Sequence, residues 1–258
     1  MDSTITLSRA VLGSCRAEMQ ILTRSMVFRI STVVLLFVIM SDFHSSAQSI
    51  GANVSTGFYM NQALILLGLY GSLLPAIAGA YLGGKEYDWG TRPWRLVVDG
   101  LGVLRSARML LLVELSMVGS LVGAGLGGVF DIANGYNLYA VGAVAIRVLY
   151  LTGVMLFWGL VGFLFATGLR SFTWGAVIPV IWIVLEPLAD FYLSRGINQV
   201  LPMWNIKVVL QALFPSQDGA VAVILPMSGD SVTSTLVFLA YLIVAVLLSS
   251  VAGRRRGN

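Results

Sequence analysis

Long apolar runs alternate with short polar stretches along almost the whole chain. Each run comes close to the roughly 20 helical residues that cross a hydrocarbon core about 30 Å thick. We therefore predict an all-α protein with six transmembrane helices, at residues 26–42, 60–83, 107–130, 138–168, 171–193 and 232–252. Because the number is even, both termini are expected on the same side of the membrane.

The fourth run, residues 138–168, is longer than one crossing requires. As a helix it would extend about 46 Å at 1.5 Å per residue. Either residues 138–147 project beyond the lipid, or the helix is strongly tilted.

The first 25 residues carry apolar side chains at the helical spacing of three and four. This stripe consists of Val11, Leu12, Cys15, Met19 and Leu22. Polar side chains are placed elsewhere around the helix: Arg9, Arg16, Glu18 and Gln20. The pattern favours a helix lying in the membrane surface over 1–25, and a disordered polar tail is the alternative.

The first apolar run also shares features with a secretory signal, because Arg24 and Arg29 precede it and small residues at 45–47 follow it. The long polar region ahead of the run and the further apolar runs behind it favour retention. We expect it to remain as the first span.

The segment 195–231 between the last two predicted spans is neither typical of a loop nor apolar enough to cross. Leu201, Trp204 and Val208 trace part of a helical face between two prolines, and the stretch "GAVAVILP" follows. Two short interfacial or re-entrant helices are favoured over an exposed loop.

Small residues recur every fourth position in two predicted spans. The stripes are Gly71, Pro75, Gly79 and Gly83 in the second span, and Gly119, Gly123 and Gly127 in the third. Such stripes let helices approach closely in lipid, and ordinary packing within the chain explains both.

Composition supports a membrane protein with one transmembrane domain over 1–258. Hydrophobic residues make up 57% of the chain, and the mean hydropathy is +0.87, which a soluble domain could reach only by exposing large apolar patches. The net charge of +4 is modest and does not indicate nucleic-acid binding. With Cys15 and His44 as the single residues of their types, we expect neither an internal disulfide nor a metal site.

Most Lys and Arg residues flank the predicted spans on one side. On that side lie Arg9, Arg16, Arg24, Arg29, Lys85, Arg92, Arg95, Arg105, Arg108, Arg170, Arg254, Arg255 and Arg256, whereas Arg195 and Lys207 lie on the other and Arg147 within the fourth span. Under the positive-inside rule, both termini and residues 84–106 are cytoplasmic. We expect a multi-pass protein of the plasma membrane.

Several chemistries have no basis in this sequence. No phosphate-binding loop ending in Gly-Lys-Ser or Gly-Lys-Thr occurs, and "GAGLGG" lies inside an apolar run, so we expect no ATP on this chain. No His-Glu-x-x-His motif is present, and a serine nucleophile could use only His44, which the topology places in an outer loop. We therefore predict no catalytic residue and no enzyme activity.

One polar segment, "GKEYDWGTRPWR", stands between the second and third runs. It combines charges with Tyr87, Trp89 and Trp94. Aromatic anchors beside charges are typical of transient protein interfaces, which favours a docking element. The alternative is a solvated turn whose aromatics lie at the lipid interface.

The residues of this segment resemble a known family. Glu86, then Gly90-Thr91, then Arg105 ahead of the third span are similar to the "E...GT...R" signature of the ABC type-2 permeases, the membrane subunits of exporters. The N-terminal helix, six spans and short outer helices match that layout. The resemblance implies that residues 84–106 form a coupling region docking on two separate ATPase subunits, which bind ATP and Mg, and that a second permease subunit, identical or homologous, pairs with this one. The coupling residues it implies are Lys85, Glu86, Tyr87, Asp88, Trp89, Gly90, Thr91 and Arg92.

Four charges inside the predicted spans are candidates for a gate or translocation path, because an unpaired charge in hydrocarbon costs several kcal/mol. They are Glu114, Arg147, Glu186 and Asp190. We hypothesise an ion pair between Arg147 and Glu186 at the outer gate. The alternative is that Arg147 extends to the lipid headgroups.

The expected function is export of an amphipathic or lipid-like compound, such as an antibiotic, an antimicrobial peptide or a lipid, powered by a separate ATPase. The size and layout are similar to the antibiotic and peptide efflux branch of the family, so antibiotic resistance is one expected role. A self-sufficient channel or secondary transporter is the alternative, and would carry a polar constellation at mid-membrane.

Overall fold

The structure is a computed structural model, which describes residues 2–49, 57–90, 101–189, 195–213 and 230–252. It is 91% helix and has no strand within these ranges, which confirms the all-α prediction. The helices are α1 (Asp2–Arg24), α2 (Met26–Ser49), α3 (Phe58–Leu66), the π-helix η1 (Leu67–Gly71), α4 (Leu73–Asp88), α6 (Leu101–Ala133), α7 (Val141–Leu169), α8 (Phe172–Ala189), α9 (Arg195–Asn198), α10 (Pro202–Leu213) and α11 (Ser231–Ala252).

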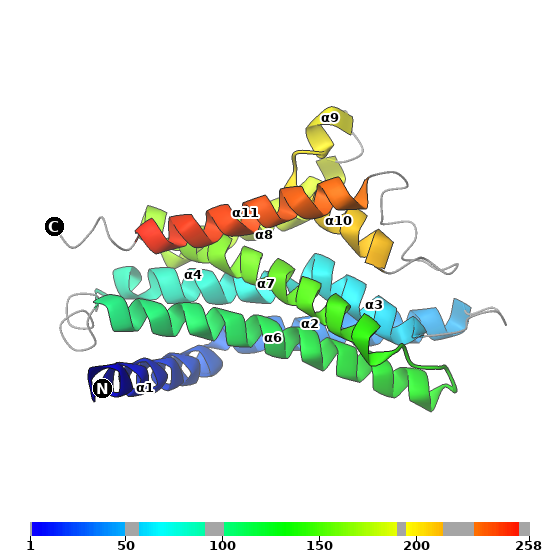
Figure 1. The fold of residues 1–258 in the computed structure, drawn as a ribbon, viewed down its shortest axis with the longest axis horizontal. Helices are drawn as coiled ribbons and strands as arrows, with labels where there is room; N and C mark the ends of the chain where they lie inside the picture. Colours follow the sequence, from blue (N-terminus) through cyan, green and yellow to red (C-terminus); the bar gives the residue numbers. More distant parts are fainter. Residues whose placement is uncertain (1, 50–56, 91–100, 190–194, 214–229, 253–258) are drawn as a thin grey trace.

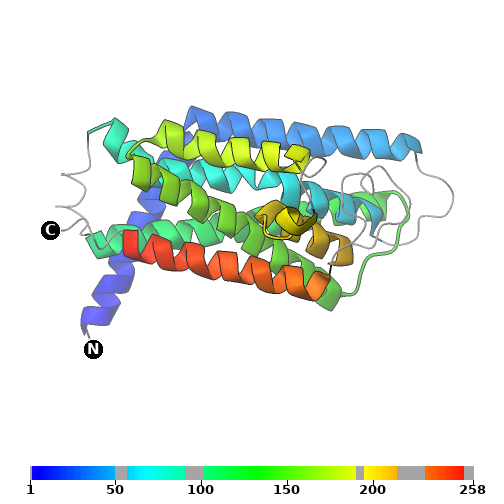
Figure 2. The same ribbon diagram turned by 90° about the horizontal axis from the view of Figure 1, so that it is seen from above.

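The long helices run side by side along one axis, with α1 projecting at one end (Figure 1). In the view turned by 90°, α2 follows one edge of the bundle and α11 the opposite edge, with α4, α6 and α7 between them (Figure 2). The last turn of α11 lies at the same end as α1, which we call the terminal end. There the Arg105 guanidinium of α6 donates a 2.6 Å hydrogen bond to the carbonyl oxygen of Ser249 in α11.

Four helical segments are long and apolar enough to cross a membrane: Phe58–Asp88, Val103–Ala133, Val141–Leu169 and Ser231–Val251. They contain most of the predicted second, third, fourth and sixth spans, so the chain is consistent with a multi-pass membrane protein. The long fourth run is a helix of 29 residues that begins at Val141.

The other two predicted spans form helices, but the described residues do not establish them as crossings. Arg9–Arg24 and Phe28–Ser41 together are apolar enough for a fifth span, but they are bent by 68° relative to each other. The apolar part of α8, Phe172–Glu186, is shorter than a typical crossing. The structure thus supports four to five candidate spans, and the predicted count of six is not confirmed.

Glycines bring α4 and α7 into backbone contact at the centre of the bundle. A Cβ at Gly79 would lie 1.8 Å from the carbonyl oxygen of Gly159, and one at Gly162 would lie 2.1 Å from that of Ala76. Such distances are sterically impossible, so only glycine fits. Gly127 of α6 approaches the α3 backbone at Met60 in the same way, and packing within the chain accounts for these positions of the predicted stripes.

The apolar stripe predicted for the N-terminal segment packs largely on the rest of the bundle. Cys15 and Leu22 are buried, and Val11 and Met19 pack against the same core. Leu12 departs from the prediction because its side chain is 54% exposed. The face of α1 that meets the bundle is therefore rotated toward Glu18, which is completely buried.

The segment predicted to form short helices after the fifth span contains α9 and α10, and "GAVAVILP" lies outside the described residues. α10 packs into the bundle more deeply than its predicted face suggested. Met203, Ile206 and Leu210 are almost completely buried. α10 is thus part of the core toward the end of the bundle opposite α1 (Figure 2).

Candidate functional site

Four charged side chains from three helices meet at the terminal end of the bundle. Glu18 comes from α1, Lys85 and Glu86 from the last turn of α4, and Arg108 from α6. All four are buried, with exposed fractions between 0% and 7%. We call these four residues the charged cluster.

The ion pairs of the charged cluster form a chain across the three helices. Lys85 Nζ pairs with Glu18 Oε2, and the Arg108 guanidinium pairs with Glu86 Oε1. The same Arg108 nitrogen lies 3.5 Å from Glu18 Oε1, which links the two pairs. The Lys85 ammonium also lies 5.0 Å from the centre of the Tyr81 ring, within cation–π range.

The charged cluster is electrically balanced, with two carboxylates and two cations. Removing charges from water costs several kcal/mol per ion, and good pairing geometry only offsets that cost. Removing one partner leaves an uncompensated buried charge and typically costs about 3–5 kcal/mol. The arrangement therefore makes α1, α4 and α6 dependent on one another at this end.

Beyond the charged cluster, α4 ends in an exposed tip that we define as Tyr87, Asp88, Trp89 and Gly90. The helix stops at Asp88, and Gly90 follows with a φ of +64°, a left-handed conformation that glycine adopts without strain. Trp89 is 59% exposed, an unusual position for so large an apolar side chain.

The α4 tip also contacts α8. The Asp88 carboxylate accepts a 2.9 Å hydrogen bond from the backbone N–H of Phe172, the first residue of α8. The Tyr81 ring packs edge-on against both Trp89 and Phe172, with centroids 5.9 and 5.6 Å away. A carboxylate at a helix N-terminus is a favourable cap, so the tip is joined to α8 as well.

The structure divides the eight predicted coupling residues into three groups. Lys85 and Glu86 are buried in the charged cluster, where their charges pair within the chain. Their part in coupling to an ATPase stays a prediction. Tyr87, Asp88, Trp89 and Gly90 remain accessible on the tip. Thr91 and Arg92 lie outside the described residues.

Two arginines of α6, Arg105 and Arg108, lie at the terminal end and have different partners. Arg105, matched to the family signature, points to Ser249 of α11, whereas Arg108 pairs with Glu86. The two arginines are three residues apart, so they are neighbours on the surface of α6. Their side chains nevertheless reach different helices.

At the other end of the bundle, Glu186 and Arg147 bind opposite ends of α10. Glu186 Oε1 accepts backbone N–H bonds from Met203 at 2.6 Å and Trp204 at 3.2 Å, and Oε2 accepts from Trp182 Nε1 at 2.5 Å. Arg147 Nε donates a 3.0 Å bond to the carbonyl oxygen of Leu213, the last residue of α10. A carboxylate at the N-terminus and a cation at the C-terminus both complement the helix dipole.

This placement rules out the hypothesised ion pair between Arg147 and Glu186. Met203 and Leu213 are separated by about 15 Å along α10 at 1.5 Å per residue, and the two charged groups bind beyond these points. Arg147 does not simply extend to headgroups either, because it is buried, with its guanidinium 3.7 Å from the centre of the Tyr139 ring. Asp190 lies outside the described residues.

Glu114, the fourth predicted path residue, lies at the contact between α1 and α6. Its Oε2 is 3.6 Å from Cys15 Sγ, which donates the weak hydrogen bond. Glu114 therefore belongs to the same helix contact as the charged cluster.

Sequence reasoning missed Glu18, Arg108 and Asp131 as functional or structural groups. Glu18 could have been found, because it follows Cys15 by three residues and precedes Leu22 by four, the spacing of one helix face. Asp131 is completely buried and accepts backbone N–H bonds from Tyr59 at 2.9 Å and Met60 at 3.1 Å at the start of α3. Nothing in the spacing along α6 points to these partners, more than 70 residues away.

No group of three or more His, Cys, Asp or Glu side chains within the described ranges could hold a metal ion. The ion pairs of the charged cluster join the end of α4 to α1 and α6, so a displacement of one of these helices acts on the other two.

No protein-family model matches the chain, and no curated protein matches it.

Proposed function

We propose that the chain is the membrane subunit of an ATP-driven exporter and that the α4 tip is where a separate ATPase subunit docks. The observation that carries this proposal is the combination of an accessible aromatic tip with a buried charged cluster directly behind it. Trp89 is 59% exposed, whereas Glu86, three residues earlier, is only 6% exposed.

An exposed tryptophan beside an acidic side chain is the kind of anchor that carries binding energy at protein interfaces. Trp89 is supported from behind by the Tyr81 ring, so little side-chain freedom remains to be lost on binding. These features favour docking over a solvated turn.

The charged cluster gives a reason why docking at the tip would move the membrane helices. A force applied to the tip reaches α1 through Lys85 and Glu18, and α6 through Glu86 and Arg108. Cores and buried networks shift between discrete arrangements rather than deforming continuously. ATP-driven closure of two ATPase subunits would therefore displace α1, α4 and α6 together and open a path between two paired permease subunits.

The same proposal gives the placement of the chain in the membrane. α2 and α8 join the four long apolar segments as crossings, which makes six spans, and α1 lies in the inner surface. α10 is a re-entrant helix on the outer side. The basic residues at the terminal end support a cytoplasmic location for both termini. The proposed membrane is the plasma membrane.

The proposed cargo is an amphipathic or lipid-like compound, such as an antibiotic, an antimicrobial peptide or a lipid. The described spans carry few charges, and two of them, Arg147 and Glu186, bind the ends of α10 and hold that helix in place. Such an interior suits an apolar or amphipathic cargo better than a sugar or an ion.

Purification of the tagged protein from its own host tests the proposal. An ATPase should co-purify, with ATP hydrolysis in the eluate. The Trp89→Ala variant should bind that ATPase about thirtyfold more weakly, the loss expected for an interface anchor worth about 2 kcal/mol. Trp174→Ala is the matched control, because Trp174 is 60% exposed but lies in α8.

The Arg108→Gln variant separates docking from transmission. It should still bind the ATPase, because Arg108 is buried, but ATP hydrolysis should no longer drive transport in reconstituted liposomes. A chain that transports cargo in liposomes without any ATPase would instead establish the channel or secondary transporter.

A further inference from the structure

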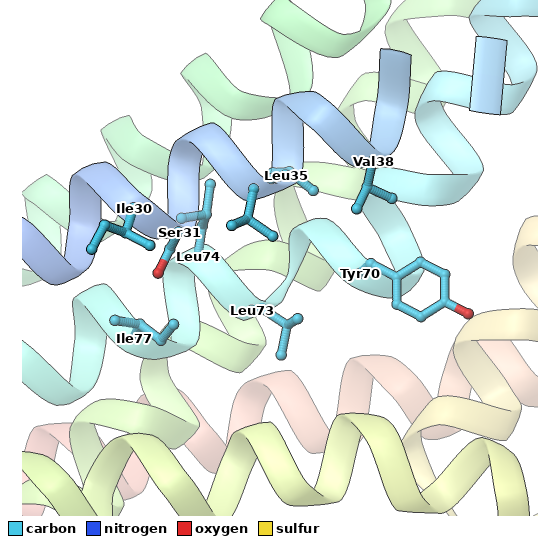
Figure 3. A pocket seen from close by; sticks show the side chains of 9 residues that line it. Ile30, Ser31, Leu35, Val38, Tyr70, Leu73, Leu74 and Ile77 are labelled. Atoms are coloured by element: carbon cyan, nitrogen blue, oxygen red, sulfur yellow. The ribbon is translucent and has the colours of Figure 1, made fainter. Parts of the chain in front are cut away.

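The helices α2 and α4 leave an apolar groove between them on the edge of the bundle. It has a volume of about 400 Å³ and is lined almost entirely by carbon. Figure 3 shows Ile30 and Val38 lining it from α2, and Leu74 and Ile77 from α4. Val34 of α2 also lines the groove. Several of the α2 side chains that line the groove are also exposed at its open side; the Val34 side chain is 54% exposed.

A second pocket of about 480 Å³ lies beside this groove, nearer to the terminal end. It is lined by Arg24, Ser25 and Met26 at the bend between α1 and α2, and by Tyr81 and Trp89. The α4 residues of both pockets recur at a spacing of three or four, from Leu74 through Ile77 and Tyr81 to Lys85, so they share one helix face. On α2, Met26, Ile30, Val34 and Val38 follow the same rule. The two pockets therefore lie one after the other along the same faces of α2 and α4, and we refer to them together as the crevice.

The length and polarity of this crevice match one leaflet of a bilayer. From Met26 to Val38 it follows α2 for about 18 Å at 1.5 Å per residue. Half of the hydrocarbon core is roughly 15 Å deep. The inner part is apolar, whereas the mouth carries charged and aromatic side chains, the order in which a phospholipid presents its acyl chain and its headgroup.

The mouth carries side chains of both charges. Lys85 pairs with Glu18, whereas the Asp88 carboxylate keeps its negative charge, because the hydrogen bond that it accepts comes from the neutral backbone N–H of Phe172. Arg24 is exposed and makes no hydrogen bond or ion pair with any side chain that the structure describes. An exposed arginine at a membrane surface attracts anionic headgroups.

We propose that the crevice between α2 and α4 binds an anionic phospholipid from the leaflet at the terminal end. One acyl chain occupies the apolar groove, and the phosphate binds Arg24 at the mouth. The lipid would lie against Tyr81 and Trp89, next to the charged cluster, and would fill the space that the 68° bend between α1 and α2 opens beside α4. The proposal depends only on membrane insertion and holds whether or not an ATPase docks at the tip.

The test uses the full-length protein in vesicles containing phosphatidylglycerol with a diazirine in the middle of one acyl chain. After irradiation, mass spectrometry maps the labelled peptides. Labelling should concentrate on residues 30–38 and 73–77 and should reach a plateau as the lipid concentration rises. It should also be stronger than the labelling obtained when phosphatidylcholine carries the same diazirine. The face of α11 around Val244, which is 50% exposed, reports ordinary contact with bulk lipid.

Two variants with matched controls locate the lipid. Val34→Trp fills the groove and should abolish its labelling, whereas Val244→Trp on α11 should not. Arg24→Gln should weaken phosphatidylglycerol binding about fivefold, the effect of one basic residue near an anionic surface. Arg9→Gln, on an exposed position about 22 Å away along α1, should have little effect.

Three results would overturn the proposal. The first is equal labelling of the groove and of the α11 face, which would mean bulk lipid only. The second is that neither the original protein nor the Arg24→Gln variant binds phosphatidylglycerol more tightly than phosphatidylcholine. The third is a photo-crosslinker at Val34 that captures a second copy of this chain in place of lipid, which would make the groove a subunit interface.

Discussion

Each residue of the charged cluster is buried with a partner of opposite charge, and this sets what a substitution there does. Arg108 serves both Glu86 and Glu18, so its loss leaves two carboxylates with only Lys85. The charged cluster is therefore expected to tolerate removal of a balanced pair better than removal of a single charge.

Arg108→Gln should lower the free energy of unfolding by about 3–5 kcal/mol, the usual effect of breaking a buried ion pair. Adding Glu86→Gln should recover part of this loss, because it removes the carboxylate that Arg108 paired with and leaves the Lys85–Glu18 pair intact. The measurement is thermal unfolding in detergent, followed by tryptophan fluorescence. A double variant no more stable than Arg108→Gln alone would show that the four charges do not act as a unit.

Gly79 is the residue at which a single methyl group should be most disruptive. Gly79→Ala places a Cβ where the Gly159 carbonyl oxygen lies, so α4 and α7 must separate, and unfolding should occur at a clearly lower temperature. Gly125→Ala in α6 is the control, because nothing lies within 4 Å of its Cβ position. Equal melting temperatures for the two variants would contradict the close approach of α4 and α7.

The sequence predicted which positions take part in unusual contacts. It did not predict which residues those positions contact. The crowding of charges at 85–92 was visible in the sequence, and so was the small-residue spacing of Gly79 and Gly83. The pairing of Glu86 with Arg108 rather than with any other arginine was not, because it depends on how α4 and α6 are rotated about their axes. Apolar side chains surround most of each helix, so the pattern does not fix that rotation.

Among the elements, α10 is the one whose position depends most on charged side chains of other helices. Its N-terminus is held by Glu186 of α8 and its C-terminus by Arg147 of α7. The length of the apolar runs predicted the long helices, since length and hydropathy are enough to place them. The short α10 was expected only as an interfacial or re-entrant piece, because no local signal shows that two charged residues from distant spans bind its ends.

Glu186→Ala should loosen α10 without unfolding the bundle. The loss of charge-assisted bonds to the first N–H groups should speed amide hydrogen exchange in residues 203–213 by about tenfold, equivalent to roughly 1.4 kcal/mol. Hydrogen exchange followed by mass spectrometry measures this directly. Asp230→Asn is the control, because the Asp230 carboxylate accepts its hydrogen bonds from Val232 and Thr233 at the N-terminus of α11 and not from α10.

For the whole molecule, the two ends of the bundle are built differently. At the terminal end, ion pairs and an Asp88 cap join α1, α4, α6 and α8, whereas toward the opposite end α10 is held between α7 and α8. The glycine contacts between α4 and α7 connect the two ends through the centre. Packed helices therefore connect the α4 tip to the opposite end of the bundle.

The most direct test of the docking proposal is to replace Trp89 with a photo-crosslinking amino acid and irradiate living cells. The account predicts a covalent adduct between position 89 and an ATP-hydrolysing subunit, and none with such a subunit when the crosslinker replaces Trp174. If position 89 crosslinks only to lipid, or labels from outside the cell, the α4 tip is not where an ATPase docks, and the proposed function is wrong.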